Sequence, residues 1–264
     1  MRYGILGPLE VTRTGEAVTP STPQQRTVLA LLLANAGSWV SLATIVDELW
    51  PARTPRSARV IVQVAVSKLR KVLPVNAIRT GPSGYLLTVD GVEFDQSEFV
   101  AEARRGRDLM AAGRLGPARD LLAAALGRWR GDALCDVACG PVLEAHARWL
   151  AELRLSTVDS RVRIDLAAGR CHDVIAELTV LLARDPGQEV LAGSLMVALH
   201  QAGRAAEAAG PHGAGQGGRR DGAAGERADG LDVRAVDQRA GQRRPFGGAA
   251  ENEDSGSRAV VHGS

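Results

Sequence analysis

Hydrophobic and polar residues alternate only briefly at the start of the chain. Residues 2–19 contain three strand-like runs, RYGILG, LEVTR and EAVT, and Thr14-Gly15 supplies a turn between the last two. Pro20 and Pro23 follow and cannot donate to a strand ladder. The pattern therefore predicts short strands that end before the first helix.

Three helical patterns come next. QQRTVLALLLANAG is apolar nearly all round over residues 28–34 and reaches a glycine stop at Gly37, which predicts a buried helix. Ser41 is a favoured N-cap for SLATIVDELW, which Pro51 ends. A third helix is predicted in PRSARVIVQVAVSKLRKVL, before Pro74.

The third helix has two distinct faces at about 100° per residue. Apolar positions fill one arc of about 140°: Ala58, Ile61, Val62, Ala65, Val66, Leu69, Val72 and Leu73. Polar positions share an adjacent arc of about 80°, with two lysines further round: Arg56, Arg59, Gln63, Ser67, Arg70, Lys68 and Lys71. Val60 and Val64 interrupt the polar side. These polar groups are the kind that read base edges and phosphates, but an ordinary amphipathic helix with a basic outside has the same pattern.

A hairpin pattern follows this helix. AIRTGPSGYLLTV predicts a strand, a turn at residues 81–84, and a second strand with alternating apolar residues. Three helices followed by such a hairpin are typical of a winged helix-turn-helix, in which Arg79 and Thr80 of the wing reach the neighbouring groove or backbone.

From Phe94 to Ala208 the pattern is helical, with an internal repeat. Ala-Gly-Arg recurs at 112–114, 168–170 and 202–204, and the last two copies are 34 residues apart, the tetratricopeptide period. In the first two copies the ninth and thirteenth residues after the glycine are leucines: Leu122, Leu126, Leu178 and Leu182. The third copy has His212 and Gln216 there, and the Gly-rich segment 209–264 is predicted to be disordered.

Charge is nearly balanced over the chain, with 32 basic and 30 acidic residues. The net charge of the whole chain therefore says little about its binding partners. The distribution is more informative, because residues 51–80 carry seven basic side chains and no acid. A basic segment in an otherwise neutral chain indicates a surface for a polyanion.

Little in the sequence favours an enzyme, a metal site or a cofactor. Cys135, Cys139 and Cys171 lack zinc-ligand spacing and are expected to be small buried thiols in helices. Acidic pairs such as Asp47-Glu48 are expected at helix surfaces, and no nucleotide-binding Gly-rich loop is present. No apolar run reaches the length of a membrane span, and no signal peptide is visible, so the protein is expected in the cytoplasm.

The ordered motifs resemble the Streptomyces antibiotic regulatory protein (SARP) family of transcriptional activators. The resemblance rests on PxQQRTVLALLLANAG, SLATIVDELWP, QVAVSKLRKVL, TGPSGYLL and the helical repeat, over about residues 2–208. It implies a mainly α fold. Residues 1–93 would form an OmpR/PhoB-type winged-helix DNA-binding domain with short strands, and 94–208 a tetratricopeptide-like bacterial transcriptional activation domain. Ala65 and Val60 depart from the family's frequent Tyr and Asn.

The resemblance also implies a function and partners. Family members bind direct repeats upstream of antibiotic biosynthesis genes, two protomers side by side, and recruit RNA polymerase holoenzyme. Carried over by position, the DNA contacts are Arg56, Arg59, Gln63, Ser67, Lys68, Arg70 and Lys71 on the recognition helix, with Arg79 and Thr80 in the wing. The alternatives are a protein-binding scaffold and a truncated regulator that binds DNA without activating. A further hypothesis is that residues 209–264 are an out-of-frame extension.

Overall fold

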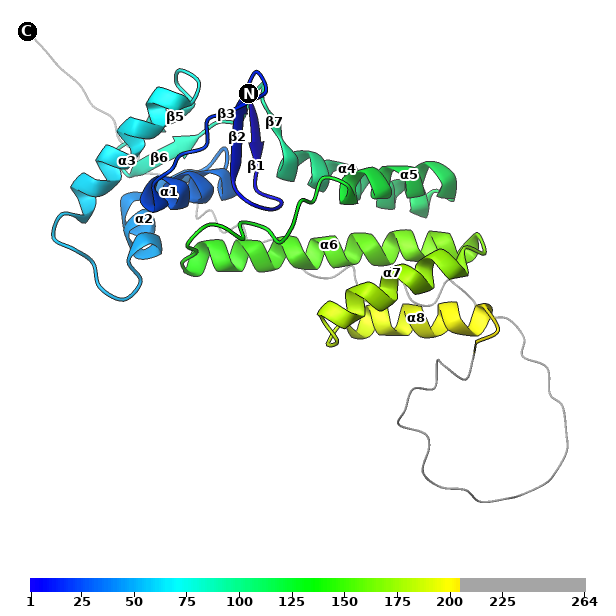
Figure 1. The fold of residues 1–264 in the computed structure, drawn as a ribbon. Helices are drawn as coiled ribbons and strands as arrows, with labels where there is room; N and C mark the ends of the chain where they lie inside the picture. Colours follow the sequence, from blue (N-terminus) through cyan, green and yellow to red (C-terminus); the bar gives the residue numbers. More distant parts are fainter. Residues whose placement is uncertain (205–264) are drawn as a thin grey trace, which may run out of the picture. The chain divides into compact units, whose positions relative to one another are not determined.

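The computed structural model describes residues 1–204, all within one compact unit (Figure 1). The expectations for His212, Gln216 and segment 209–264, including disorder and the out-of-frame extension, lie outside the described residues. The described part is mainly helical, which confirms the predicted fold class. Within residues 1–204, no helix combines the length and apolar character needed to cross a bilayer.

The N-terminal strands form a small sheet with the order β3-β2-β1-β7: β1 (Arg2–Gly4), β2 (Glu10–Arg13), β3 (Glu16–Ala17) and β7 (Glu93–Phe94). The predicted turn joins β2 and β3, and the φ angles of Thr14 (50°) and Gly15 (89°) are both positive, as a type I′ turn requires. Phe94, expected to open the helical region, instead ends β7, because it pairs in parallel with Tyr3 of β1.

The first two helices form as their local signals predict. Helix α1 (Pro23–Ala34) buries every residue from Thr27 to Leu33. Helix α2 (Leu42–Leu49) begins after Ser41, whose Oγ accepts a hydrogen bond of 2.9 Å from the backbone N–H of Thr44. This side-chain cap satisfies one of the N–H groups that a helix start leaves without a partner.

The predicted third helix and wing are also present: α3 (Ala58–Val72), β5 (Ile78–Thr80) and β6 (Gly84–Leu87). Strand β4 (Trp39–Ser41) completes a second sheet with the order β4-β6-β5. Gly84 is required where β6 meets β4, because a Cβ atom there would lie 1.9 Å from the carbonyl oxygen of Val40.

Five helices make up the rest of the described chain: α4 (Asp95–Ala111), α5 (Leu115–Leu126), α6 (Pro141–Ala167), α7 (Cys171–Arg184) and α8 (Glu189–Gln201). Each Ala-Gly-Arg copy ends a helix with its glycine at a φ of 72–75°. The N–H of each following arginine donates to a carbonyl five residues back, at 2.8–2.9 Å. This is the Schellman motif, so the sequence repeat is a repeat of helix ends.

A single buried carboxylate joins α5, α6 and α7. Asp165 on α6 is 3% exposed and accepts from Arg119 Nε (2.9 Å), Arg170 Nη2 (2.6 Å) and Arg161 Nη1 (3.0 Å). Burial alone would raise the pKa of Asp165, but the hydrogen bonds from Arg119 and Arg170 hold this pKa below its usual value. The ionised carboxylate therefore holds the helices together.

The connection between α5 and α6 is not helical, and it corrects the expectation for two cysteines. Cys135 is exposed and Cys139 is half-buried in this loop, whereas Cys171 is buried at the start of α7 as expected. The loop's backbone also pairs with the N-terminal part of the chain: the N–H groups of Arg130 and Leu134 donate to the carbonyl oxygens of Leu6 and Gly7, both at 2.8 Å.

Candidate nucleic-acid interface

Helix α3 divides into the two faces that its periodicity predicts. Its inner side is buried in the main hydrophobic core, through Ala58, Val62, Ala65, Val66 and Leu69 in the helix and Leu73 just after it. Ile61 and Val72 lie at the margin and are half-buried. The rest of the helix faces outward, and Val60 and Val64 are exposed within this outer face.

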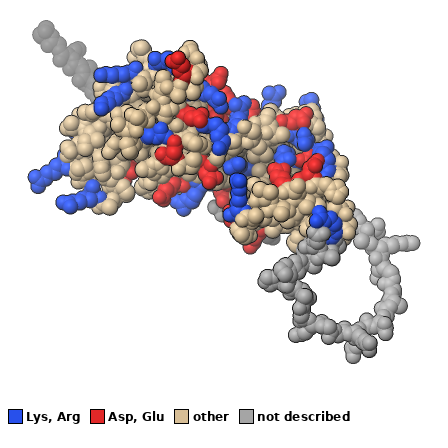
Figure 2. Space-filling view, in the orientation of Figure 1, with Lys and Arg blue, Asp and Glu red and all other residues tan. Residues whose placement is uncertain are grey.

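All nine predicted contact residues are exposed: Arg56, Arg59, Gln63, Ser67, Lys68, Arg70, Lys71, Arg79 and Thr80. Figure 2 shows Lys and Arg side chains projecting from the end of the molecule that carries α3. Within the described residues, none of the six cations in this set forms a salt bridge, although the helical region holds many such pairs. The positive charge of this surface is therefore not neutralised by neighbouring acids.

Arg70 differs from the other cations because it joins the helix to the wing. Its Nη2 donates to the carbonyl oxygen of Ile78 at 3.0 Å and to Thr80 Oγ1 at 2.6 Å, and its Nε also reaches the Ile78 oxygen at 3.2 Å. The sequence predicted Arg70 only as a DNA contact on the polar face of α3. In the structure its hydrogen bonds also connect α3 to strand β5. The Arg79 side chain, by contrast, has no hydrogen bond to any described residue, and its backbone pairs with Leu86 of β6.

Glu48 connects the helix-turn-helix to α6, and it corrects the expectation of a surface acid. The side chain is 3% exposed, and its carboxylate accepts from the backbone N–H groups of Gly140 (2.7 Å), Val142 (2.8 Å) and Leu143 (3.0 Å). A carboxylate is favourable there because it meets the positive end of the α6 dipole and unpaired N–H groups. Its neighbour Asp47 is exposed, as expected.

Asp95 makes a second buried link between the two regions. It opens α4, is 1% exposed, and accepts from the N–H groups of Ile5 (2.9 Å) and Leu6 (3.1 Å) and from Arg130 Nη2 (2.9 Å). Sequence reasoning did not identify either link, because each joins residues about 90 positions apart. A polar residue at a helix end is a weak signal unless the partner backbone is known.

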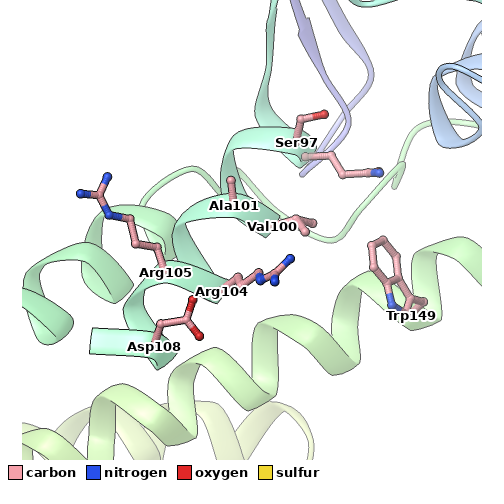
Figure 3. Close-up of a pocket in the computed structure, with 8 residues that line it drawn as sticks. Ser97, Val100, Ala101, Arg104, Arg105, Asp108 and Trp149 are labelled. Atoms are coloured by element: carbon pink, nitrogen blue, oxygen red, sulfur yellow. The ribbon is translucent and has the colours of Figure 1, made fainter. Parts of the chain in front are cut away.

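A shallow hollow of about 530 Å³ lies between α4 and α6 (Figure 3). Trp149 rises from α6, while Val100, Arg104 and Asp108 lie on α4 across from it. The Trp149 side chain is 46% exposed, and its ring packs against His146, which hydrogen-bonds Gln96 of α4 at 2.7 Å. Exposed tryptophan beside arginine is typical of protein contact sites.

Comparison with protein families assigns both halves of the chain. Residues 15–92 match the family "Transcriptional regulatory protein, C terminal", and residues 94–216 match the "Bacterial transcriptional activator domain". The first match contains α3 and the wing, and the second contains all five helices of the repeat region.

Individual relatives agree with these assignments. The regulatory protein DnrI of Streptomyces peucetius is 35% identical over 79% of this chain and 80% of its own length. AfsR of Streptomyces coelicolor is 36% identical over 79% of this chain, which spans only 21% of that longer protein. A solved structure of Mycobacterium tuberculosis EmbR, in complex with a low-affinity phosphopeptide, superposes with a TM-score of 0.74 and 35% identity over 79% of this chain and 57% of that one. The chain belongs to the SARP family of transcriptional activators.

Proposed function

We propose that this activator binds direct repeats upstream of secondary-metabolite (antibiotic) biosynthesis genes, as two protomers side by side, and recruits RNA polymerase holoenzyme. In this proposal residues 1–93 bind DNA in the cytoplasm and residues 94–208 contact the polymerase. The observation that carries the proposal is the exposed polar face of α3, whose cations have no acidic partners among the described residues. Such a surface favours a polyanion.

The geometry of α3 supports a division of roles in the DNA contacts. Arg59, Gln63 and Ser67 follow one another at four-residue steps, so they form a row about 12 Å long, the length of three to four base pairs. Arginine suits guanine edges and glutamine suits adenine edges in the major groove. The exposed side chains of Val60 and Val64 suit the methyl groups of thymine.

The remaining cations suit the DNA backbone. Three of them lie beside the row formed by Arg59, Gln63 and Ser67: Arg56, Lys68 and Lys71. Phosphate contacts at such positions fix the register of a helix on the duplex. The wing residues Arg79 and Thr80 would touch the adjoining groove or backbone. Arg70 would act partly through the wing, because its hydrogen bonds hold Ile78 and Thr80.

Footprinting and gel-shift titration on the promoters beside the gene test the DNA part of the proposal. We expect two protected repeats and an affinity that falls steeply with salt, because bound cations of the DNA are released. Protection of one site would contradict the side-by-side arrangement. DNA binding that is absent or independent of salt would favour the protein-binding scaffold instead.

Transcription with purified RNA polymerase holoenzyme tests the activation part. The hollow with Trp149 is a candidate polymerase contact, so Trp149→Ala should reduce activated transcription while DNA affinity stays unchanged. Leu115→Ala, which removes another exposed apolar side chain away from that hollow, is the matched control. Wild-type protein that binds its promoter without raising transcription would favour the truncated-regulator alternative.

A further inference from the structure

A pocket of about 500 Å³ lies on the helical region, apart from both the α3 surface and the hollow with Trp149. Its walls come from the loop before α6, the middle of α6, the end of α7 and the start of α8. The apolar lining consists of Trp129, Ala133, Ala147, Ala151, Leu155, Val158, Leu181 and Leu191. This volume and mainly apolar lining are typical of sites that hold one small organic molecule.

Arg154 gives the pocket its specific chemistry. Its guanidinium carbon lies 4.7 Å from the centroid of the Trp129 ring, a cation–π contact on a half-buried side chain. Within residues 1–204 this guanidinium forms no salt bridge and no hydrogen bond. Arg161, about two helical turns further along α6, pairs with both Asp165 and Glu177. Arg154 therefore retains N–H donors for an external acceptor.

A second guanidinium faces the same space. Arg184, at the end of α7, lines the pocket and also has no salt bridge among the described residues. Burial lowers the pKa of Arg154, Asp132 opposes this, and the positive charge of Arg184 lowers it further. An anion placed between the two arginines would relieve their repulsion.

The acids of the pocket leave these arginines available. Asp185 accepts hydrogen bonds from Gly187 N–H (3.3 Å) and Gln188 Nε2 (2.5 Å), and Glu152 is exposed. Asp132 attracts Arg154 without a hydrogen bond to it. Three acids and three arginines line the pocket, so their formal charges balance. An anionic ligand would therefore be recognised by direct contact with the arginines more than by long-range attraction.

We propose that this pocket binds a small amphipathic organic acid. Its carboxylate would pair with Arg154 and Arg184, and its flat apolar body would lie among Trp129, Leu155 and Leu191. The planar guanidinium fork matches a carboxylate with two hydrogen bonds, and the apolar lining accepts a body of about two fused rings. The pocket is of single-ligand size, which favours a small molecule over a protein segment.

Titration calorimetry of the whole chain with 2-naphthoate tests the proposal, with 2-naphthamide as the uncharged control. We expect the acid to bind about tenfold more tightly than the amide, because the amide loses the charge-assisted pairing. Arg154→Gln should weaken the acid about tenfold, and Arg184→Gln severalfold. Arg114→Gln, at an exposed arginine just before α5 and outside the pocket, should leave the affinity unchanged.

Three outcomes would overturn the site: no naphthoate binding at millimolar concentration, equal affinity for acid and amide, or undiminished affinity in both variants. Arg184 is exposed, so its variant tests the site even if Arg154→Gln destabilises the fold. Binding of an acidic, aromatic peptide without binding of naphthoate would overturn the small-molecule proposal. None of these measurements depends on DNA binding, so a negative result for the pocket would not contradict the proposed function, and the reverse also holds.

Discussion

The outer face of α3 and the buried junctions of the helical region use charge in opposite ways. On α3, arginines and lysines are exposed, and none forms a salt bridge within the described residues. At the junctions, the carboxylates of Asp165, Glu48 and Asp95 are almost fully buried, and each gathers three N–H donors or more. Charge without a partner is available to a ligand, whereas charge surrounded by donors stabilises the fold. Changes at the junctions should therefore alter stability, and changes on α3 should alter DNA affinity.

The largest effect is expected at Asp165. Asp165→Asn removes the charge that three arginines share, and it should lower the free energy of unfolding by about 3–5 kcal/mol. The reason is that Arg170 loses its acidic partner, while Arg119 and Arg161 keep only the exposed carboxylates of Asp120 and Glu177. Urea denaturation followed by circular dichroism measures this. Asp120→Asn, at an exposed acid with one long contact of 3.7 Å to Arg119, should change stability by less than about 0.5 kcal/mol.

The pH dependence of stability gives a second view of Asp165. Its folded pKa is lower than its unfolded value of about 3.9, so its contribution is complete above that value and is lost as the pH falls through the folded pKa. Wild-type stability should thus fall more steeply below about pH 4 than that of Asp165→Asn. Parallel acid curves for the two proteins would contradict the assigned role.

Glu48 should have the next largest effect. Glu48→Ala leaves three N–H groups at the start of α6 without their acceptor and should cost about 2–3 kcal/mol. The same denaturation measurement applies, and the exposed neighbour gives the control, Asp47→Asn, which should be near neutral. A Glu48 variant as stable as wild type would show that the contact between α2 and α6 is incidental.

On the α3 side, Arg59→Ala should leave stability unchanged but weaken specific DNA binding by about 1–3 kcal/mol and relax the preference at one base position. Gel-shift titration on matched and mutated repeats measures both quantities. Arg105→Ala, an exposed arginine on α4, is the control and should bind DNA like wild type. If Arg59→Ala lowered the stability, the charge on α3 would also stabilise the fold, which would contradict the difference drawn between the two regions.

The smallest effect is expected at Lys71, proposed as a phosphate contact. Lys71→Ala should weaken specific and non-specific DNA alike, by less than about 1 kcal/mol at moderate salt, and should reduce the salt slope by about one. Binding isotherms at several salt concentrations provide the measurement. A loss of affinity that depends on the DNA sequence would instead indicate that Lys71 contacts a base.

The sequence predicted local structure well because local structure depends on neighbours in the chain. Ser41 can cap only the helix that follows it, and the positive φ angles of Thr14 and Gly15 belong to one tight turn. The three Ala-Gly-Arg copies end helices by bonds that span five residues. The two faces of α3 follow from its periodicity alone.

What the tertiary structure decided involves partners far apart in the sequence. Strand β7 pairs in parallel with β1, about 90 residues earlier in the chain. The burial of Glu48 at the start of α6 and the exposure of Cys135 depend on how the loop before α6 meets the winged helix. The second role of Arg70 depends on the wing folding back beside α3. By itself, then, the chain's pattern of residues determined the helices, the wing and the polar, exposed side of α3. Which buried acids join these elements was decided only by packing, because an acid becomes a structural contact only where distant N–H donors converge on it.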